Sequence, residues 1–504
     1  MIDAFIGMGQ GFLIALTPQN LYYCFIGCLF GTIVGVLPGI GPLAGISLLL
    51  PATFGMPPVS ALIMLAGIYY GAMYGGSTTS ILMNIPGEAA SVVTCIDGYQ
   101  MARKGRAGAA LFISAWGSFI GGNLSVLGIA LLAPALADFA VKFGPAEMFA
   151  IMVLAMMLVG YVGSGSVLKT MCMVVLGLFL GTIGMDTMTG YLRMTYGVKE
   201  LADGIGFIPV AMGLFGIAEI LSSTQDTLVR EVLKPKLREL LPNREELRRS
   251  LGPVCRGSVL GFFIGLLPGA AHIIAGFASY ALEKKLAAHP EEFGSGRIEG
   301  VAGPETANNA ATGGAMIPFL SLGIPSGPAT AVMMIALLIH GIKPGPLLIQ
   351  ENPEVFWGVI ASMYIGNVVL LILNLPLVGL FVNLLRIPFR LLFPIILTIC
   401  LIGVYSVNAS PAELWIMLIS GLVGFVLRRF QFDVAPLILA LIIGPMMELA
   451  FRQSLMMSGG NFAVFLGSPI SVTLISLSVL LFLGSLFKPL LAARSTNNAS
   501  PIKK

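Results

Sequence analysis

The stretch Gly31-Thr-Ile-Val-Gly35-Val-Leu-Pro38-Gly39 recurs in the second half of the chain as Gly261-Phe-Phe-Ile-Gly265-Leu-Leu-Pro268-Gly269, at an offset of 230 residues. Each copy places a Pro-Gly pair inside an apolar run. Because proline lacks the helical hydrogen-bond donor and glycine weakens a helix, both runs are predicted to break there. Matched breaks in the two halves of a hydrophobic chain indicate the binding site of a membrane transporter.

The composition predicts a membrane protein. Hydrophobic residues make up 57% of the 504 residues and charged residues only 10%, with a mean hydropathy of +0.93. Soluble domains carry about 25% charged residues. Long uniform apolar runs, such as 124–136 and 472–486, favour helices over barrel strands. Since a spanning helix needs roughly 20 apolar residues, we expect an all-α polytopic protein with about 12 transmembrane segments.

Charge and hydropathy divide the chain into four parts. We expect a first transmembrane repeat at 1–222, a charged linker at 223–252, a second transmembrane repeat at 253–490 and a polar tail at 491–504. The linker region is rich in Lys and Arg, which places it in the cytoplasm by the positive-inside rule. The net charge of +4 is too small to indicate nucleic-acid binding. The six cysteines lack metal-ligand spacing, so we expect no metal site.

A second, looser correspondence supports a duplicated chain. In the first half, Gly75-Gly76-Ser77-Thr78-Thr79-Ser80 precedes Asn84-Ile85-Pro86-Gly87, and in the second half Thr312-Gly313-Gly314 precedes Gly323-Ile324-Pro325-Ser326-Gly327. We therefore expect two related repeats with broken or re-entrant helices. Inverted topology is favoured, which requires an odd number of spans in each half, and hydropathy leaves that parity open.

The broken segments and the polar clusters beside them suit an anionic ligand. A helix that resumes after a break points its N-terminal amides at the gap, and such ends favour anions. Hydroxyl and amide side chains add neutral donors, although a hydroxyl in a helix often only bonds to its preceding turn. The candidate substrate-binding residues are Pro38, Gly39, Gly41, Ser77, Thr78, Thr79, Asn84, Pro268, Gly269, Asn308, Asn309, Thr312, Pro325 and Ser326.

Acidic residues within the apolar segments are few, and an intramembrane acid is read by default as functional. We take Asp186, between Gly184 and Gly190, as the candidate for coupling to an ion, together with His272 next to the second Pro-Gly pair. Glu448 and Arg452 are four residues apart on an expected helix and are predicted to pair. The acids that flank the polar clusters are expected nearer an interface: Glu88, Asp97, Glu299 and Glu305.

Several chemistries are disfavoured by missing motifs. The chain has no G-x-x-x-x-G-K-[ST] motif, so we expect no direct use of ATP, and it has no H-E-x-x-H, C-x-x-C or G-x-S-x-G motif. We therefore expect a protein that is not an enzyme and carries no cofactor apart from Na⁺ or H⁺ as a coupling ion. A passive anion channel and a membrane-embedded enzyme remain the alternative interpretations.

The chain resembles the large membrane subunit of the tripartite tricarboxylate transporters (TctA-type). The resemblance covers about residues 15–470 and rests on Gly35-Val-Leu-Pro-Gly-Ile-Gly-Pro42, Tyr70-Gly-Ala-Met-Tyr-Gly-Gly-Ser-Thr-Thr-Ser80, Asn84-Ile-Pro-Gly-Glu88, Asp97-Gly-Tyr99, Leu267-Pro-Gly269, Glu305-Thr-Ala-Asn-Asn309 and Gly323-Ile-Pro325. In this sequence Ala270-Ala271-His272 follows the second Pro-Gly pair, where the family more often has Gly-x-Gly-like small residues.

The resemblance implies a multi-pass protein of the bacterial inner membrane that imports a citrate-like di- or tricarboxylate. It also implies a small membrane subunit and a periplasmic solute-binding protein as partners, and coupling of uptake to a sodium or proton gradient. We expect alternating access of the elevator type, with the broken helices as tips or hinges. The sequence leaves open which carboxylate is imported and which ion drives uptake, with what stoichiometry. It also leaves open whether the protein forms a homodimer.

Overall fold

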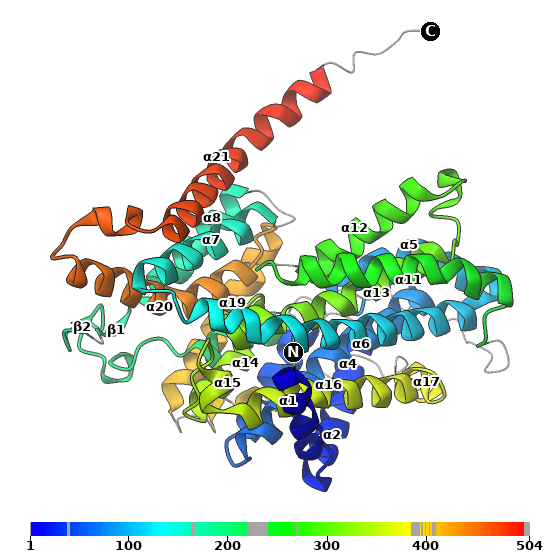
Figure 1. The fold of residues 1–504 in the computed structure, drawn as a ribbon, viewed down its shortest axis with the longest axis horizontal. Helices are drawn as coiled ribbons and strands as arrows, with labels where there is room; N and C mark the ends of the chain where they lie inside the picture. Colours follow the sequence, from blue (N-terminus) through cyan, green and yellow to red (C-terminus); the bar gives the residue numbers. More distant parts are fainter. Residues whose placement is uncertain are drawn as a thin grey trace. The chain divides into compact units, whose positions relative to one another are not determined.

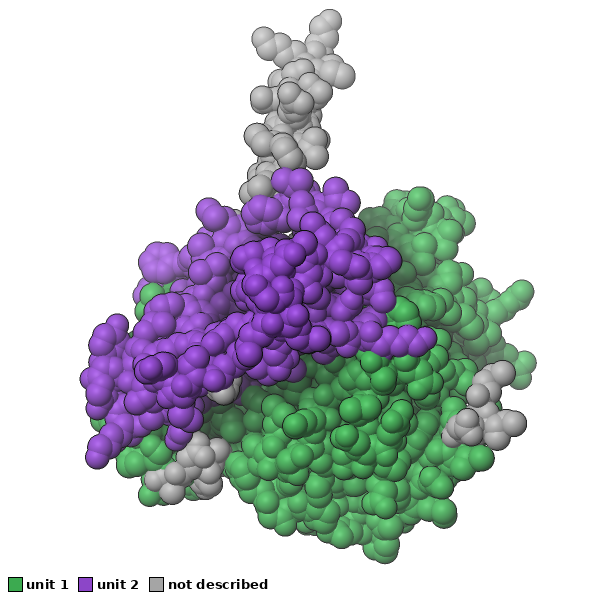
Figure 2. Space-filling view, turned by 60° about the vertical axis from the view of Figure 1, so that its left-hand side comes forward, with its two compact units in different colours: residues 1–141, 208–267, 271–426 green, residues 142–207, 268–270, 427–504 purple. Residues whose placement is uncertain are grey.

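The computed structural model describes the whole chain except Met1 and residues 38–40, 163–166, 187, 219–220, 222–239, 269–270, 385–393, 395–396, 399, 403, 406–409 and 498–504. The described residues are mostly helical, and they form two compact units (Figures 1 and 2). Unit 1 comprises residues 1–141, 208–267 and 271–426, and unit 2 comprises 142–207, 268–270 and 427–504. Unit 1 thus draws on both predicted repeats, and the predicted boundaries at 222 and 252 stay predictions.

Unit 1 contains most of the helices. They are α1 (Ile2–Ala15), α2 (Pro18–Val36), α3 (Gly41–Leu49), η1 (Pro51–Thr53), α4 (Pro58–Met83), η2 (Ala89–Ser91), α5 (Val92–Met101), η3 (Ala102–Arg106), α6 (Ala107–Ala140), α9 (Phe207–Ala211), η5 (Met212–Ile217), α11 (Arg244–Gly265), α12 (Ala271–Leu286), η7 (Pro290–Glu292), α13 (Glu299–Gly314), η8 (Pro318–Leu322), α14 (Pro328–Ile339), α15 (Leu348–Glu351), α16 (Pro353–Asn374), α17 (Val378–Leu384) and most of α19 (Pro411–Arg429). Figure 1 shows α11, α13 and α6 side by side, where α13 packs against both neighbours.

Unit 2 is a smaller helical unit with one short hairpin. Its elements are α7 (Pro145–Val162), α8 (Val167–Gly181), β1 (Gly184–Met185), β2 (Leu192–Arg193), η4 (Lys199–Leu201), α20 (Ala435–Met457), η9 (Phe462–Leu466) and α21 (Pro469–Asn497). The two strands pair antiparallel, with Gly184 opposite Arg193. Helix α20 packs against α7 and α8, and α21 packs against α7.

Six helical segments in the described parts of the chain are long and apolar enough to span a membrane. These are Pro18–Val36, Pro58–Met83, Ala89–Ala140, Pro353–Asn374, Pro411–Arg429 and Pro436–Met457. Several shorter apolar helices accompany them. The all-α membrane class is therefore confirmed, whereas the total of about 12 spans and the inverted topology stay predictions.

The chain leaves the helical conformation around both Pro-Gly pairs. Helix α2 ends at Val36, Leu37 is extended, and α3 begins at Gly41, whose φ of +67° suits glycine. Helix α11 ends at Gly265, and α12 begins at Ala271. Pro38, Gly39 and Gly269 themselves lie outside the described residues, but the helix ends on either side agree with the predicted breaks.

Two helix pairs, α2 with α4 and α11 with α13, pack through equivalent glycines. A Cβ atom on Gly31 would lie 2.5 Å from the carbonyl oxygen of Ile68, and one on Gly261 would clash with that of Ala307. The same holds one turn to either side, for Gly27 with Met64, Gly35 with Ala72, Gly257 with Gly303 and Gly265 with Ala311. The offset is 230 residues for the glycines and 239 residues for their partners, so both halves use one packing scheme.

The offset of 239 continues through the polar segments. Asn84 ends α4 with φ 57°, and Gly323 ends η8 with φ 69°. In the turns that follow, the Ser91 hydroxyl accepts from the N–H of Glu88, and the Thr330 hydroxyl accepts from the N–H of Gly327. We call residues 18–101 the first motif and residues 244–339 the second motif. In this register Gly75 matches Gly314, one residue away from the alignment that the sequence suggested.

The two motifs also pack against each other in a reciprocal way. Helix α3 of the first motif packs against α14 of the second, and α12 of the second motif packs against η2 and α5 of the first. The helix that follows each break therefore packs on its own motif and also contacts the other one. This arrangement brings α4, α5 and α13 together in the interior of unit 1.

Candidate substrate site

The Ser/Thr run of α4 lies in the protein interior. Ser77, Thr78, Thr79 and Ser80 are all at most 3% exposed. The hydroxyl of Thr79 donates to the carbonyl oxygen of Val36 at 2.6 Å. Val36 is the last residue of α2, so this bond satisfies a carbonyl that the break leaves without a helical partner. One hydroxyl of the predicted Ser/Thr run thus holds the end of α2 at the first break.

The other hydroxyls of the run connect α4 to neighbouring elements. Ser77 donates to Oε2 of Glu305 on α13 at 2.6 Å, and Ser80 donates to the hydroxyl of Ser91 at 2.9 Å. Thr94 on α5 donates to Oε1 of Glu305. Both carboxylate oxygens of Glu305 therefore accept a hydroxyl hydrogen bond in the interior of unit 1.

Glu88 is the second carboxylate of this interior. Its Oε2 accepts from the N–H of Ala90 at 2.7 Å, and its Oε1 lies 3.4 Å from Nδ2 of Asn308 on α13. We call Ser77, Glu88, Thr94, Glu305 and Asn308 the polar centre. All five side chains come from the two motifs and are at most 6% exposed.

The neighbouring predicted residues bond within the protein. Asn309 donates from Nδ2 to the Ser118 hydroxyl at 2.7 Å and to the backbone oxygen of Glu305 at 3.1 Å. Thr312 donates to the backbone oxygen of Asn308 in the preceding turn, as hydroxyls in helices often do. Ser326 donates to the backbone oxygen of Ala315 at 2.8 Å, next to Pro325 in the bend before α14.

Two of the acids that flank the polar clusters are buried inside the protein. Glu88 is 6% exposed and Glu305 is 1% exposed. Among the ion pairs formed by the described residues, none involves either carboxylate. Their expected position near a membrane interface stays a prediction, but hydropathy alone gives no sign that hydroxyls on α4 and α5 would contact Glu305. The Glu305-x-x-Asn308 spacing, which puts both side chains on one helix face, is the signal that was available.

Asp97 is also buried, and it has a structural role. Its carboxylate accepts from the backbone N–H groups of Gly294, Gly296 and Arg297 at 2.7–3.0 Å, and from the Tyr280 hydroxyl at 2.9 Å. The residue thereby anchors the loop between α12 and α13 to α5. Its charge is dispersed over four donors, which is how buried carboxylates are usually accommodated.

The candidate ion-coupling residues lie apart in sequence and in surroundings. His272 is in the first turn of α12, directly after the second break, and is partly exposed. Asp186 belongs to unit 2, next to β1, so it is not part of the polar centre of unit 1. An ion-coupling role for either residue stays a prediction.

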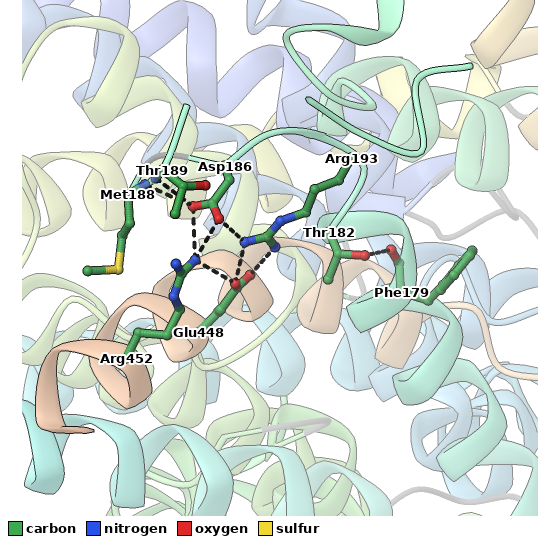
Figure 3. Close-up of polar contacts among 8 residues, drawn as sticks. All are labelled: Phe179, Thr182, Asp186, Met188, Thr189, Arg193, Glu448 and Arg452. Carbon is green, nitrogen blue, oxygen red and sulfur yellow. Dashed lines mark hydrogen bonds and ion pairs between the residues drawn. The ribbon is translucent and has the colours of Figure 1, made fainter. Parts of the chain in front are cut away.

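Asp186 sits in a cluster of two acids and two arginines (Figure 3). Arg193 lies 2.5 Å from Asp186 and 2.8 Å from Glu448, and Arg452 lies 2.8 Å from Asp186 and 3.2 Å from Glu448. Although burial of Asp186 acts to raise its pKa, hydrogen bonds from Thr189, Arg193 and Arg452 lower it below the ordinary range. The predicted pairing of Glu448 with Arg452 is confirmed, within a larger network than the sequence indicated.

Within the described residues, no group of three or more His, Cys, Asp or Glu side chains is placed to hold a metal ion. The oxygen atoms of the polar centre are instead hydroxyl, amide and carboxylate groups that the two motifs contribute jointly. Together, the interrupted helices and the buried polar centre define a multi-pass helical membrane protein of the transporter kind.

The chain belongs to the tripartite tricarboxylate transporter TctA family, which it matches over residues 21–439. It is 51% identical over 479 residues, 95% of each chain, to the "Uncharacterized 52.8 kDa protein in TAR-I ttuC' 3'region" of Agrobacterium vitis. A second protein of that organism, the "Uncharacterized protein in TAR-II ttuC' 3'region", is 48% identical over 219 residues, which are 44% of this chain and 90% of that protein. No solved structure matches the chain.

Proposed function

We propose that this chain is the membrane subunit that imports a citrate-like di- or tricarboxylate across the bacterial inner membrane, driven by an ion gradient. A periplasmic binding protein delivers the substrate, and a small membrane subunit completes the system. The family is one of tricarboxylate transporters, which supports this assignment at the level of class.

The observation that carries the proposal is the reciprocal arrangement of the two motifs. Each motif has a broken helix, and α3 and α12 both begin directly after a break. Helices of this kind present unpaired N–H groups and a positive dipole end, which suit carboxylates. Each of these two helices packs on the opposite motif, so a substrate held at the breaks would contact both motifs. Movement of the motifs would then change the side of the membrane to which the substrate is exposed.

A flux experiment tests the proposal. The membrane subunits are reconstituted into proteoliposomes with the binding protein, and uptake of labelled citrate is measured under an imposed sodium or pH gradient. We expect saturable uptake that accumulates substrate against its gradient. Non-saturable flux would support a passive channel instead, and uptake that ignores every cation gradient would contradict ion coupling.

Four alanine variants test the involvement of the polar residues: Ser77→Ala, Thr78→Ala, Asn308→Ala and Asn309→Ala. Loss of a hydrogen bond to a charged or buried group costs about 1–3 kcal/mol, so uptake should fall by roughly tenfold while membrane insertion persists. Ser258→Ala is the matched control, because Ser258 is equally buried on α11 but bonds only to Val254 in its own preceding turn. Wild-type uptake by all four variants would contradict the site.

A further inference from the structure

Because the two motifs share one fold, a residue that only one of them has at an equivalent position is not required for that fold. At the constant offset of 239 residues, Glu88 corresponds to Gly327 and Glu305 corresponds to Ala66. Gly327 begins its turn with the same hydroxyl contact and no carboxylate. Ala66 is 1% exposed in α4, so this helix packs with a methyl group at the position of Glu305. Neither carboxylate is therefore required to build its motif.

Among the residues that the structure describes, no Lys, Arg or His pairs with either carboxylate. Glu305 has hydroxyl partners only, on Ser77, Thr94 and Ser114. Glu88 has the backbone N–H groups of Ala90 and Ser91 and one distant amide donor, and all of these partners are uncharged. Burial of an unpaired carboxylate is expensive, and two of them in one interior repel each other. The remaining titratable groups that face them are the Tyr69 hydroxyl of α4, near Glu88, and the Cys95 thiol of α5, near Glu305. None of these groups supplies a cation.

The polar centre also contains a hydrogen-bond acceptor without a partner. Asn308 is 1% exposed, and its Oδ1 has no hydrogen-bond partner. The Nδ2 atom of the same amide faces Glu88, which fixes the amide orientation because the reverse would bring Oδ1 against the carboxylate. A buried acceptor without a donor costs about 1–3 kcal/mol, so it is normally satisfied by a ligand or water. This acceptor and the Glu88 carboxylate are adjacent and need the same kind of partner.

We propose that Glu88, Asn308 and Glu305 bind the cation whose gradient drives transport. The atoms that would coordinate the cation are all oxygens, as a small hard cation requires. A single positive charge, delivered as Na⁺ or as a proton, would neutralise the carboxylates. This inference rests on the proposed function, since a carboxylate substrate would be repelled by both carboxylates in this low-dielectric interior until the cation has bound. Cation and substrate would therefore bind together, which is the condition for symport.

Substrate affinity measured with and without the cation tests this directly. Binding of labelled citrate to the purified membrane complex is measured at fixed pH with Na⁺ exchanged for choline, and in Na⁺-free buffer across a pH series. In the wild type we expect the effective cation to tighten citrate binding by about 5–150-fold. Response to Na⁺ alone assigns the site to Na⁺, and response to pH alone assigns it to the proton. No response to either overturns the proposal.

Glutamine variants test whether the cation dependence of citrate binding comes from the polar centre. In Glu88→Gln and in Glu305→Gln, the cation should no longer change citrate affinity, because the charge that binds it is gone. Glu299→Gln is the matched control: Glu299 is on the same helix but is paired with Arg249, so cation dependence should persist. Wild-type cation dependence in both polar-centre variants would overturn the assignment.

Two further outcomes are distinguishable. If the wild type binds no carboxylate under any condition, the proposed function has failed. Cation binding is then tested in the absence of substrate. For this, the thermal unfolding midpoint of the wild type is measured against Na⁺ at constant ionic strength and against pH. A midpoint that rises with Na⁺ or with falling pH supports a cation site, and a midpoint that responds to neither overturns it. The same measurement decides the matter if the glutamine variants do not fold.

Discussion

At the scale of single residues, the fold depends on places where a side chain is absent. The glycines of α2 and α11 let the backbones of two helix pairs meet closely, which is how helices associate in lipid, where apolar side chains gain little from burial. Gly31 illustrates this, because a Cβ atom there would lie 2.5 Å from the carbonyl oxygen of Ile68. The backbone carbonyl cannot move aside as a flexible side chain could.

Alanine at these glycines should therefore destabilise the protein. For Gly31→Ala and Gly261→Ala we expect a loss of about 1–3 kcal/mol, as for overpacking in other cores, seen as a lower thermal unfolding midpoint in detergent. Gly9→Ala on α1 is the control, since nothing lies within 4 Å of its added Cβ. An unchanged midpoint in both of the first two variants would show that α2–α4 and α11–α13 do not pack this closely.

The charge cluster around Asp186 leads to a residue-level prediction in unit 2. Asp186→Asn should loosen the segment 183–206 and speed hydrogen exchange of its amides, because Arg193 and Arg452 each lose a charged partner. Asp203→Asn is the control, an exposed acid in the same segment. Since the pKa of Asp186 is lowered, its contribution is complete above the ordinary Asp pKa of about 3.9 and is lost only as the pH falls below it. Loosening of the wild-type segment between about pH 5 and 7 would contradict this assignment.

At the scale of elements, the helix breaks could be predicted from sequence, whereas their surroundings could not. Proline and glycine act locally, so the ends of α2 and α11 follow from residues next to them. The partners of Glu305 lie on α4 and α5, more than 200 residues earlier in the chain. Hydropathy windows average over neighbours in sequence and give no information on such contacts. The hydroxyl partners of Glu305 could therefore not be predicted from the sequence.

A second element-scale prediction concerns α5 and the loop 287–298. The Asp97 carboxylate accepts from three loop amides, and hydrogen bonds to a charged group contribute about 1.5–3 kcal/mol. Asp97→Asn should therefore increase hydrogen exchange of Gly294 and Gly296 without unfolding α13. Asp138→Asn, an exposed acid on α6, should leave this exchange unchanged. Equal protection of the loop in the Asp97 variant would show that the carboxylate is not its anchor.

At the scale of the whole molecule, positive residues of unit 1 gather at one place. Lys104 donates to the backbone oxygen of Ser295 at 2.6 Å, Arg106 pairs with Glu246, and Arg249 pairs with Glu299. A cavity of about 240 Å³ between η3, the start of α11 and the loop before α13 is lined by Lys104, Arg106, Arg249 and Arg297. Three segments that are far apart in sequence thus bring Lys and Arg to the same surface. By the positive-inside rule, we expect that surface to face the cytoplasm.

Cysteine labelling tests this orientation. Glu245 is exposed at the start of α11, so Glu245→Cys gives a reporter on the basic surface, in a background where the exposed Cys172 and Cys255 are changed to Ser. A membrane-impermeant maleimide should label the reporter in inside-out vesicles and leave it unmodified in right-side-out vesicles. Labelling after detergent solubilisation measures the total, and the background protein without the reporter measures residual reaction. The opposite pattern would place the basic surface on the periplasmic side, which would contradict the orientation expected from the positive-inside rule.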